Sequence, residues 1–183
     1  MLKRAYYVRF NTVTGDLMLF KPTFHVKNVL SINKEFLEKN GVTALVLDMD
    51  NTLSMHGNPC AEAGVSEWLC EMRALGIKMR VVSNNTNKRV APLAAKLGLS
   101  FTANGAKPLT FGITRAMKAM NAGKSETLVV GDQIFTDIMA GNLKGVRTVL
   151  VEPFHLENTW TFKLKRRLES LVFKRDYSNL ELK

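Results

Sequence analysis

The chain has 183 residues, of which 46% are hydrophobic and 23% are charged, and its formal net charge is +10. This composition is typical of a folded soluble protein with one core, and no apolar run approaches the roughly 20 residues that a membrane-spanning helix needs. Cys60 and Cys70 form no CxxC or Cys/His array, so neither a disulfide nor a zinc site is expected. The basic excess favours polyanionic partners: nucleic acid, an anionic membrane surface or a phosphorylated substrate.

In chain order, the first predicted element is a short helix at Asn33–Lys39, with Ser31 as a candidate cap and Gly41 at its end. The helix lies within residues 1–43, which we interpret as an N-terminal extension packed on the core. The basic residues near the N-terminus are not followed by an apolar stretch. We therefore expect no secretory signal and a cytoplasmic location.

Short apolar strands and amphipathic helices then alternate along residues 44–155, which we interpret as one core domain. The expected strands are Ala44–Leu47, Lys78–Val82, Ser100–Ala103, Thr127–Val130 and Thr148–Val151. Apolar residues at helical spacing predict the helices that connect them, at 65–75, 90–97, 113–120 and 136–143. This alternation predicts an α/β fold with a central, mostly parallel sheet flanked by helices.

Residues 156–183 are predicted to form a basic amphipathic C-terminal helix. Trp160 and Leu164 fall on one side of this helix, and Arg166 and Arg167 fall on the other. One interpretation is that the apolar side docks on the sheet and leaves a solvated basic face. The other is that the helix lies on anionic lipid, which would place the protein peripherally at the inner membrane face.

The first strand of the core ends in two acids, Asp48 and Asp50. Side chains alternate along a strand, so both acids are expected on one face at its carboxyl end, where open α/β sheets bind their ligands. Two carboxylates held this close repel each other unless a cation lies between them or one keeps a proton. The pair therefore predicts a metal ion and covalent chemistry.

Three later strands also end in polar residues that suit phosphate chemistry. Ser83 and Asn84 offer a hydroxyl and backbone N–H groups, and Lys107 offers a cation. Asp132 and Asp137 supply further oxygen ligands for a hard cation. Each has an alternative role by itself: Ser83 or Asp132 as a helix cap, and Lys107 as a solvated surface charge. Their shared position at one sheet edge favours a common site.

These segments resemble the four motifs of the haloacid dehalogenase (HAD) superfamily of aspartate-nucleophile phosphatases. The specific matches are Asp48-Met49-Asp50-Asn51-Thr52-Leu53 and Gly131-Asp132-Gln133-x-x-Thr136-Asp137. The Val-Ser-Asn-Asn and Lys-Pro segments are similar to those of the YqeG family, a capless group in subfamily IIIA. The resemblance implies a Rossmann-like HAD core without a cap domain.

The resemblance also implies a mechanism and its catalytic residues. Asp48 would be the nucleophile that forms an aspartyl-phosphate intermediate. Asp50 would protonate the leaving oxygen and then deprotonate the attacking water. The ligands of a Mg²⁺ ion would be Asp48, Asp132 and Asp50 through its carbonyl, and Asp137 would help in the outer shell or by orienting Lys107. The residues that would bind the substrate phosphate are Thr52, Ser83, Asn84 through its N–H, and Lys107.

The segments between Asp50 and Ser83, and between Ser83 and Lys107, are too short to hold a cap domain. An open site needs a large substrate or a partner surface to complete it. Together with the resemblance, this favours phosphatidylglycerophosphate at a membrane surface. The alternatives are a soluble phosphatase acting on a phosphoprotein, nucleotide or sugar phosphate, and a basic nucleic-acid or ribosome-associated module. The last is disfavoured because no RRM, KH, zinc-finger or helix-turn-helix motif is present.

Overall fold

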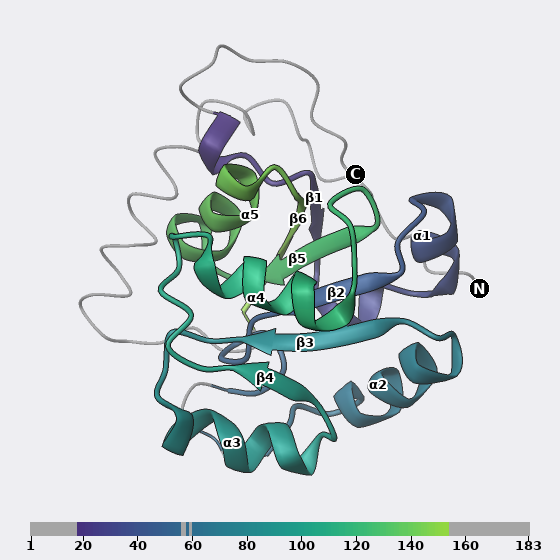
Figure 1. The fold of residues 1–183 in the computed structure, drawn as a ribbon. Coiled ribbons are helices and arrows are strands. Elements are labelled where there is room, and N and C mark those ends of the chain that lie inside the picture. The colour runs from purple at the N-terminus through teal and green to yellow at the C-terminus, as the bar shows by residue number, and fades with distance from the viewer. Residues whose placement is uncertain (1–17, 56–57, 59, 154–183) are drawn as a thin grey trace.

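The computed structural model describes residues 18–55, 58 and 60–153 of the chain. Its centre is a six-stranded sheet with the strand order β1-β6-β5-β2-β3-β4, and every neighbouring pair of strands is parallel. The strands are β1 (Phe24–Val26), β2 (Ala44–Leu47), β3 (Lys78–Val82), β4 (Ser100–Thr102), β5 (Thr127–Gly131) and β6 (Arg147–Val151). The predicted parallel α/β sheet is confirmed (Figure 1).

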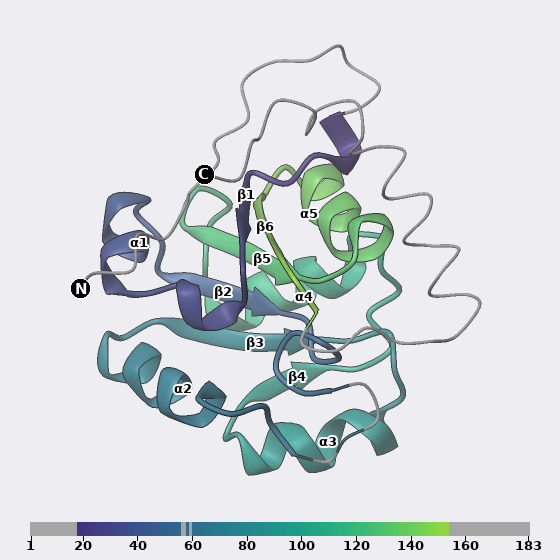
Figure 2. The same ribbon diagram turned by 180° about the vertical axis from the view of Figure 1, so that it is seen from behind.

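Helices cover both faces of the sheet. The α-helices are α1 (Lys34–Lys39), α2 (Val65–Ala74), α3 (Asn87–Lys96), α4 (Phe111–Met120) and α5 (Met139–Lys144). On one face, α1, α2 and α3 pack their apolar side chains against residues such as Leu45 and Leu47 of β2. On the other face, α4 and α5 pack against Ala44 and Val46. Strand β2 is therefore buried on both sides. Helix α4 lies in front of the sheet in Figure 1 and behind it in Figure 2.

The N-terminal segment contributes a strand that the sequence analysis does not predict. Strand β1 adds to the edge of the sheet by pairing with β6, with Phe24 opposite Val149. The segment then turns through a short 3₁₀ helix, Val29–Ser31, and the indole of Trp68 on α2 donates a hydrogen bond of 2.8 Å to the Ile32 carbonyl. Part of the predicted extension thus belongs to the sheet.

The cap of helix α1 differs from the expectation. Asn33, rather than Ser31, is the N-cap, and its side chain accepts a hydrogen bond of 2.9 Å from the Phe36 N–H. Ser31 ends the preceding 3₁₀ helix. The other differences are small: β4 ends at Thr102, and the predicted helix at 136–143 is a π-helical turn, Ile134–Ile138, that continues into α5.

The predicted C-terminal helix at 156–183 lies outside the described residues. None of the helices in the described part of the chain combines the length and apolar character that crossing a bilayer requires.

Candidate active site

The candidate site lies where three neighbouring strands end. Strand β2 pairs with β3 on one side and with β5 on the other, and all three run in the same direction. Asp48 directly follows β2, Ser83 follows β3 and Asp132 follows β5. Parallel pairing therefore brings these residues to one edge of the sheet, as the order of motifs predicts.

A cluster of buried charges occupies this edge. One carboxylate oxygen from each of Asp48, Asp132 and Asp137 lies within 4.8 Å of the others, and all three residues are buried. The Lys107 ammonium donates a hydrogen bond of 2.6 Å to Asp48 Oδ1 and one of 2.5 Å to Asp137 Oδ1. Four residues that are distant in the sequence thus form one ionic cluster.

Burial and charge change the acidity of two members of this cluster. Burial raises the pKa of Asp48 to about 7, while the adjacent Lys107 ammonium lowers it and Asp137 raises it further. For Lys107, burial lowers the pKa, but the carboxylates of Asp137 and Asp48 outweigh it and raise the pKa above its usual range. Lys107 is therefore a permanent cation, whereas Asp48 is poised to titrate near neutral pH.

The donor set of the cluster fits a divalent metal ion. Three carboxylates face a single ammonium group, so negative charge is in excess when all of the acids are ionised. Every donor is an oxygen, the ligand that hard cations such as Mg²⁺ and Ca²⁺ prefer. Asp48, Asp132 and Asp137 are the described acids whose carboxylates lie close enough together to surround such an ion.

The position of Asp137 depends on a glycine that precedes Asp132. A β-carbon on Gly131 would lie 2.3 Å from Asp137 Cγ, far inside any real contact distance. The Gln133 N–H also donates a hydrogen bond of 3.2 Å to Asp137 Oδ2. The Gly-Asp-Gln segment therefore holds Asp137 against Lys107, a role that sequence reasoning missed.

Asn84 holds the backbone of Lys107. Its Nδ2 donates to the Lys107 carbonyl at 2.8 Å, and its Oδ1 accepts from the Lys107 N–H at 2.7 Å. The neighbouring Ser83 hydroxyl is buried and accepts a hydrogen bond of 3.1 Å from the Asn85 N–H. The predicted phosphate contacts of Ser83 and the Asn84 N–H remain predictions, and the side chain of Asn84 has a positioning role that the sequence does not reveal.

The second acid of the first motif has different partners. Asn85 Nδ2 donates a hydrogen bond of 2.6 Å to Asp50 Oδ2, and the Arg89 guanidinium lies 3.3 Å from Asp50 Oδ1. Thr52 is fully buried in the turn after Asp50, and its hydroxyl has no hydrogen-bond partner within the described part of the chain. Sequence reasoning missed Asn85 and Arg89, although both lie in the segment that joins β3 to the first turn of α3.

Comparisons with known proteins agree with this geometry. The model of the haloacid dehalogenase-like hydrolase family matches residues 51–151. "Probable phosphatase YqeG" of Bacillus subtilis (strain 168) is 35% identical, and the aligned region covers 84% of this chain and 89% of that protein. "Phosphatidylglycerophosphate phosphatase 1, chloroplastic/mitochondrial" of Arabidopsis thaliana is 28% identical over 90% of this chain and 50% of that protein.

Solved structures show the same fold. A Listeria monocytogenes serotype 4b protein superimposes with a TM-score of 0.51 at 18% identity, over 73% of this chain and 99% of that one. A Vibrio cholerae protein assigned as a 3-deoxy-D-manno-octulosonate 8-phosphate phosphatase gives a TM-score of 0.52 at 12% identity, over 82% and 93%. The chain therefore belongs to the haloacid dehalogenase-like hydrolase family. Within that family it is a phosphatase of the YqeG group.

Proposed function

We propose that this phosphatase is a Mg²⁺-dependent phosphomonoester hydrolase that works through an aspartyl-phosphate at Asp48, and that it dephosphorylates phosphatidylglycerophosphate at a membrane surface. The observation that carries the proposed chemistry is the buried cluster of Asp48, Lys107, Asp132 and Asp137 at the carboxyl ends of β2 and β5. Asp48, Asp132 and the Asp50 carbonyl would hold a Mg²⁺ ion, and Asp137 would lie in its outer shell. The ion would neutralise charge on the phosphoryl group.

The residues of the chain then divide the reaction between them. An oxygen of Asp48 forms a bond to phosphorus as the ester bond to the leaving oxygen breaks. Asp50 gives its proton to that oxygen and later takes one from the water that breaks the Asp48–phosphorus bond. Lys107, held by the side chain of Asn84, keeps a positive charge beside Asp48 throughout. Thr52, Ser83 and the Asn84 N–H complete the proposed phosphate site.

Two features support a lipid substrate. Within the described residues, only α2 lies between β2 and β3, and only α3 and β4 lie between β3 and α4, so no cap domain is inserted between these elements. Leu109 and Phe111 follow Lys107 closely and are 55% and 64% exposed. Large apolar side chains that are exposed a few residues after Lys107 suit contact with a membrane. The Arabidopsis relative is named for the same substrate.

The chemistry is tested by Asp48→Asn. Asparagine matches aspartate in shape but cannot form the acyl-phosphate, so Mg²⁺-dependent hydrolysis of a generic phosphomonoester should vanish while circular dichroism shows a folded protein. Retained turnover in this variant would contradict the proposal.

The substrate is tested by comparing phosphatidylglycerophosphate in anionic vesicles with a panel of soluble phosphoproteins, nucleotides and sugar phosphates. A Leu109→Ser, Phe111→Ser double variant should lower the ratio of vesicle to soluble turnover several-fold. Leu143→Ser, which changes an exposed leucine on α5, is the matched control and should keep the wild-type ratio. Faster turnover of a soluble ester than of the lipid would favour the soluble alternative.

A further inference from the structure

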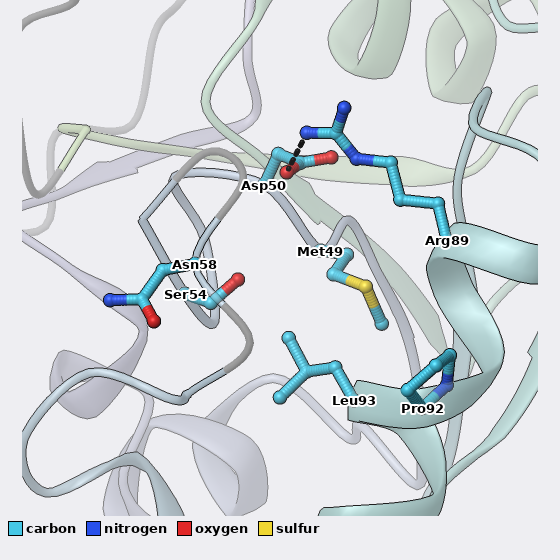
Figure 3. A pocket seen from close by; sticks show the side chains of 7 residues that line it. All are labelled: Met49, Asp50, Ser54, Asn58, Arg89, Pro92 and Leu93. Carbon is cyan, nitrogen blue, oxygen red and sulfur yellow. Dashed lines mark hydrogen bonds and ion pairs between the residues drawn. The ribbon is translucent and has the colours of Figure 1, made fainter.

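A small cavity opens beside Asp50, between the turn that follows β2 and helix α3 (Figure 3). Its volume is about 150 Å³. Its walls include three apolar side chains, Met49, Pro92 and Leu93, and three polar ones, Asp50, Ser54 and Arg89. We call it the Arg89 cavity.

The contents of this cavity follow from the proposed role of Asp50. If Asp50 gives a proton to the leaving oxygen, the atoms bonded to that oxygen must lie next to the Asp50 carboxyl. Asp50 lines the Arg89 cavity, so this space is adjacent to the leaving group rather than to the phosphoryl group. The phosphoryl group would instead bind at the buried cluster around Asp48 and Lys107.

The size of the cavity limits what it can hold. Ligand pockets for whole small molecules usually measure about 300–1,000 Å³, and this one measures about 150 Å³. It therefore suits a short fragment, such as a three-carbon polyol, and is too small for a nucleoside or an acyl chain. Its apolar wall of Met49, Pro92 and Leu93 suits the CH₂ groups of such a fragment.

The charge of the cavity comes from Arg89. Its guanidinium lies 3.3 Å from Asp50 Oδ1, and its side chain is 41% exposed, so a ligand can reach it. A guanidinium has five N–H donors in a planar fork that matches phosphate and carboxylate groups. Arg89 can thus contact Asp50 and an anionic group of a ligand with different N–H groups.

We propose that the Arg89 cavity is the leaving-group subsite, and that Arg89 selects phosphomonoesters whose leaving group carries a second anionic group about three carbons away. This inference rests on the proposed function, because it takes the role of Asp50 from it. The required chemistry is a phosphomonoester joined through a short polyol to a second phosphate, which is present both in a phosphoglycerol lipid headgroup and in a soluble glycerol bisphosphate. Arg89 is thereby a specificity-determining residue.

The experiment compares two soluble substrates that differ only in the second anion, glycerol 1,3-bisphosphate and glycerol 1-phosphate, with saturating Mg²⁺. A charge-assisted hydrogen bond to the second phosphate predicts a preference in kcat/KM of about tenfold or more for the bisphosphate, after correction for its two equivalent phosphates. Arg89→Gln should bring this ratio close to one, and Arg89→Lys should restore part of it. Because both substrates are measured in the same variant, any effect of Arg89 on Asp50 cancels.

The matched control is Lys88→Gln. Lys88 is the exposed cation that precedes Arg89 on α3, but it does not line the cavity, so the wild-type preference should persist.

A third arm measures phosphatidylglycerophosphate in vesicles against glycerol 1-phosphate. Dependence on Arg89 in the lipid arm identifies the second anion as the lipid phosphodiester, and dependence confined to the bisphosphate identifies a soluble substrate.

Two results would overturn the inference. The first is equal kcat/KM for the two soluble substrates together with no dependence on Arg89 in the lipid arm, which would leave the Arg89–Asp50 pair as a surface ion pair. The second is a preference for the bisphosphate that survives in Arg89→Gln. Failure of the proposed function looks different, since wild-type protein would then release no phosphate from any of the substrates, or Asp48→Asn would be as active as wild type.

Discussion

The two acids of the Asp48-Met49-Asp50 motif lie in contrasting regions of the molecule. The side chain of Asp48 is 10% exposed and is paired with Lys107, whose side chain is 5% exposed. The side chain of Asp50 is 15% exposed and faces Arg89, which is 41% exposed. Breaking a buried ion pair leaves an uncompensated charge in the core, whereas a pair with a solvent-accessible partner such as Arg89 contributes less to stability. Substitutions in the buried cluster should therefore change stability and activity together, and those around Asp50 should change activity with little change in stability.

Lys107→Met should have the largest effect because it removes the cation that faces two buried carboxylates. We expect the free energy of unfolding in EDTA to fall by about 3–5 kcal/mol, measured by urea denaturation. Phosphatase activity should be lost as well. Added Mg²⁺ should restore part of the stability, because the ion replaces the missing positive charge.

Lys118→Met is the control for this variant, since Lys118 is an exposed lysine on α4. It should lose less than about 0.5 kcal/mol. Equal losses of unfolding free energy in Lys107→Met and Lys118→Met would mean that the buried cluster contributes no more to stability than a surface lysine.

Gly131→Ala tests whether the cluster needs the close approach of backbone to Asp137. The new methyl group would lie 2.3 Å from Asp137 Cγ, so Asp137 must move away from Lys107. Overpacking of this kind costs about 1–3 kcal/mol in unfolding free energy. We also expect activity to fall at least tenfold, measured as kcat/KM.

Gly123→Ala is the matched control, because its methyl group would meet only Glu126 Oε1 at an ordinary 3.5 Å. Wild-type activity in Gly131→Ala would show that Asp137 is not needed where the structure places it.

Much of this arrangement follows from the sequence, for identifiable physical reasons. Strand β2 matches its predicted bounds because it is a short, fully buried apolar run at the core of a parallel sheet, and such a run is visible in the sequence. Strand β3 also matches its predicted bounds, although only its last two residues, Val81 and Val82, are buried. Parallel topology then requires Asp48, Ser83 and Asp132 to meet at one edge. Pattern and topology together therefore predict which residues assemble.

Other features depend on contacts that no local pattern encodes. Strand β1 has only three residues and owes its place to pairing with β6. The alternation of side chains along a strand does not apply beyond Leu47, where β2 ends, so it could not predict that Asp48 faces Lys107 while Asp50 faces Asn85. The hydrogen bonds of Asn84 to the Lys107 backbone span two loops and are equally invisible in sequence.

Asn84→Ala and Asn85→Ala sharpen the comparison with two adjacent residues of one type. Asn84→Ala loses two hydrogen bonds to the Lys107 backbone, so unfolding free energy should fall by about 1–2 kcal/mol and kcat should fall as well. Asn85→Ala loses its contact with Asp50, so kcat should fall with a stability change below about 0.5 kcal/mol. The reverse pattern of stability losses would contradict the division between the two regions.

The buried carboxyl of Asp48 also predicts a pH dependence of stability. Burial raises the pKa of Asp48 from its ordinary value of 3.8 to about 7 in the folded protein. Between about pH 4 and pH 7 the folded state therefore binds more protons than the unfolded chain, so this group makes unfolding free energy fall as pH rises, by at most about 1.4 kcal/mol per pH unit. Urea denaturation in EDTA at pH 5 and pH 7 measures the slope, and Asp48→Asn should lack the part of the slope that comes from Asp48.

Mg²⁺ should act in the opposite sense, stabilising the protein more at pH 8 than at pH 5, because the ion competes with the proton for the Asp48 carboxylate. An unchanged slope in Asp48→Asn would show that the buried acid is already ionised across this range.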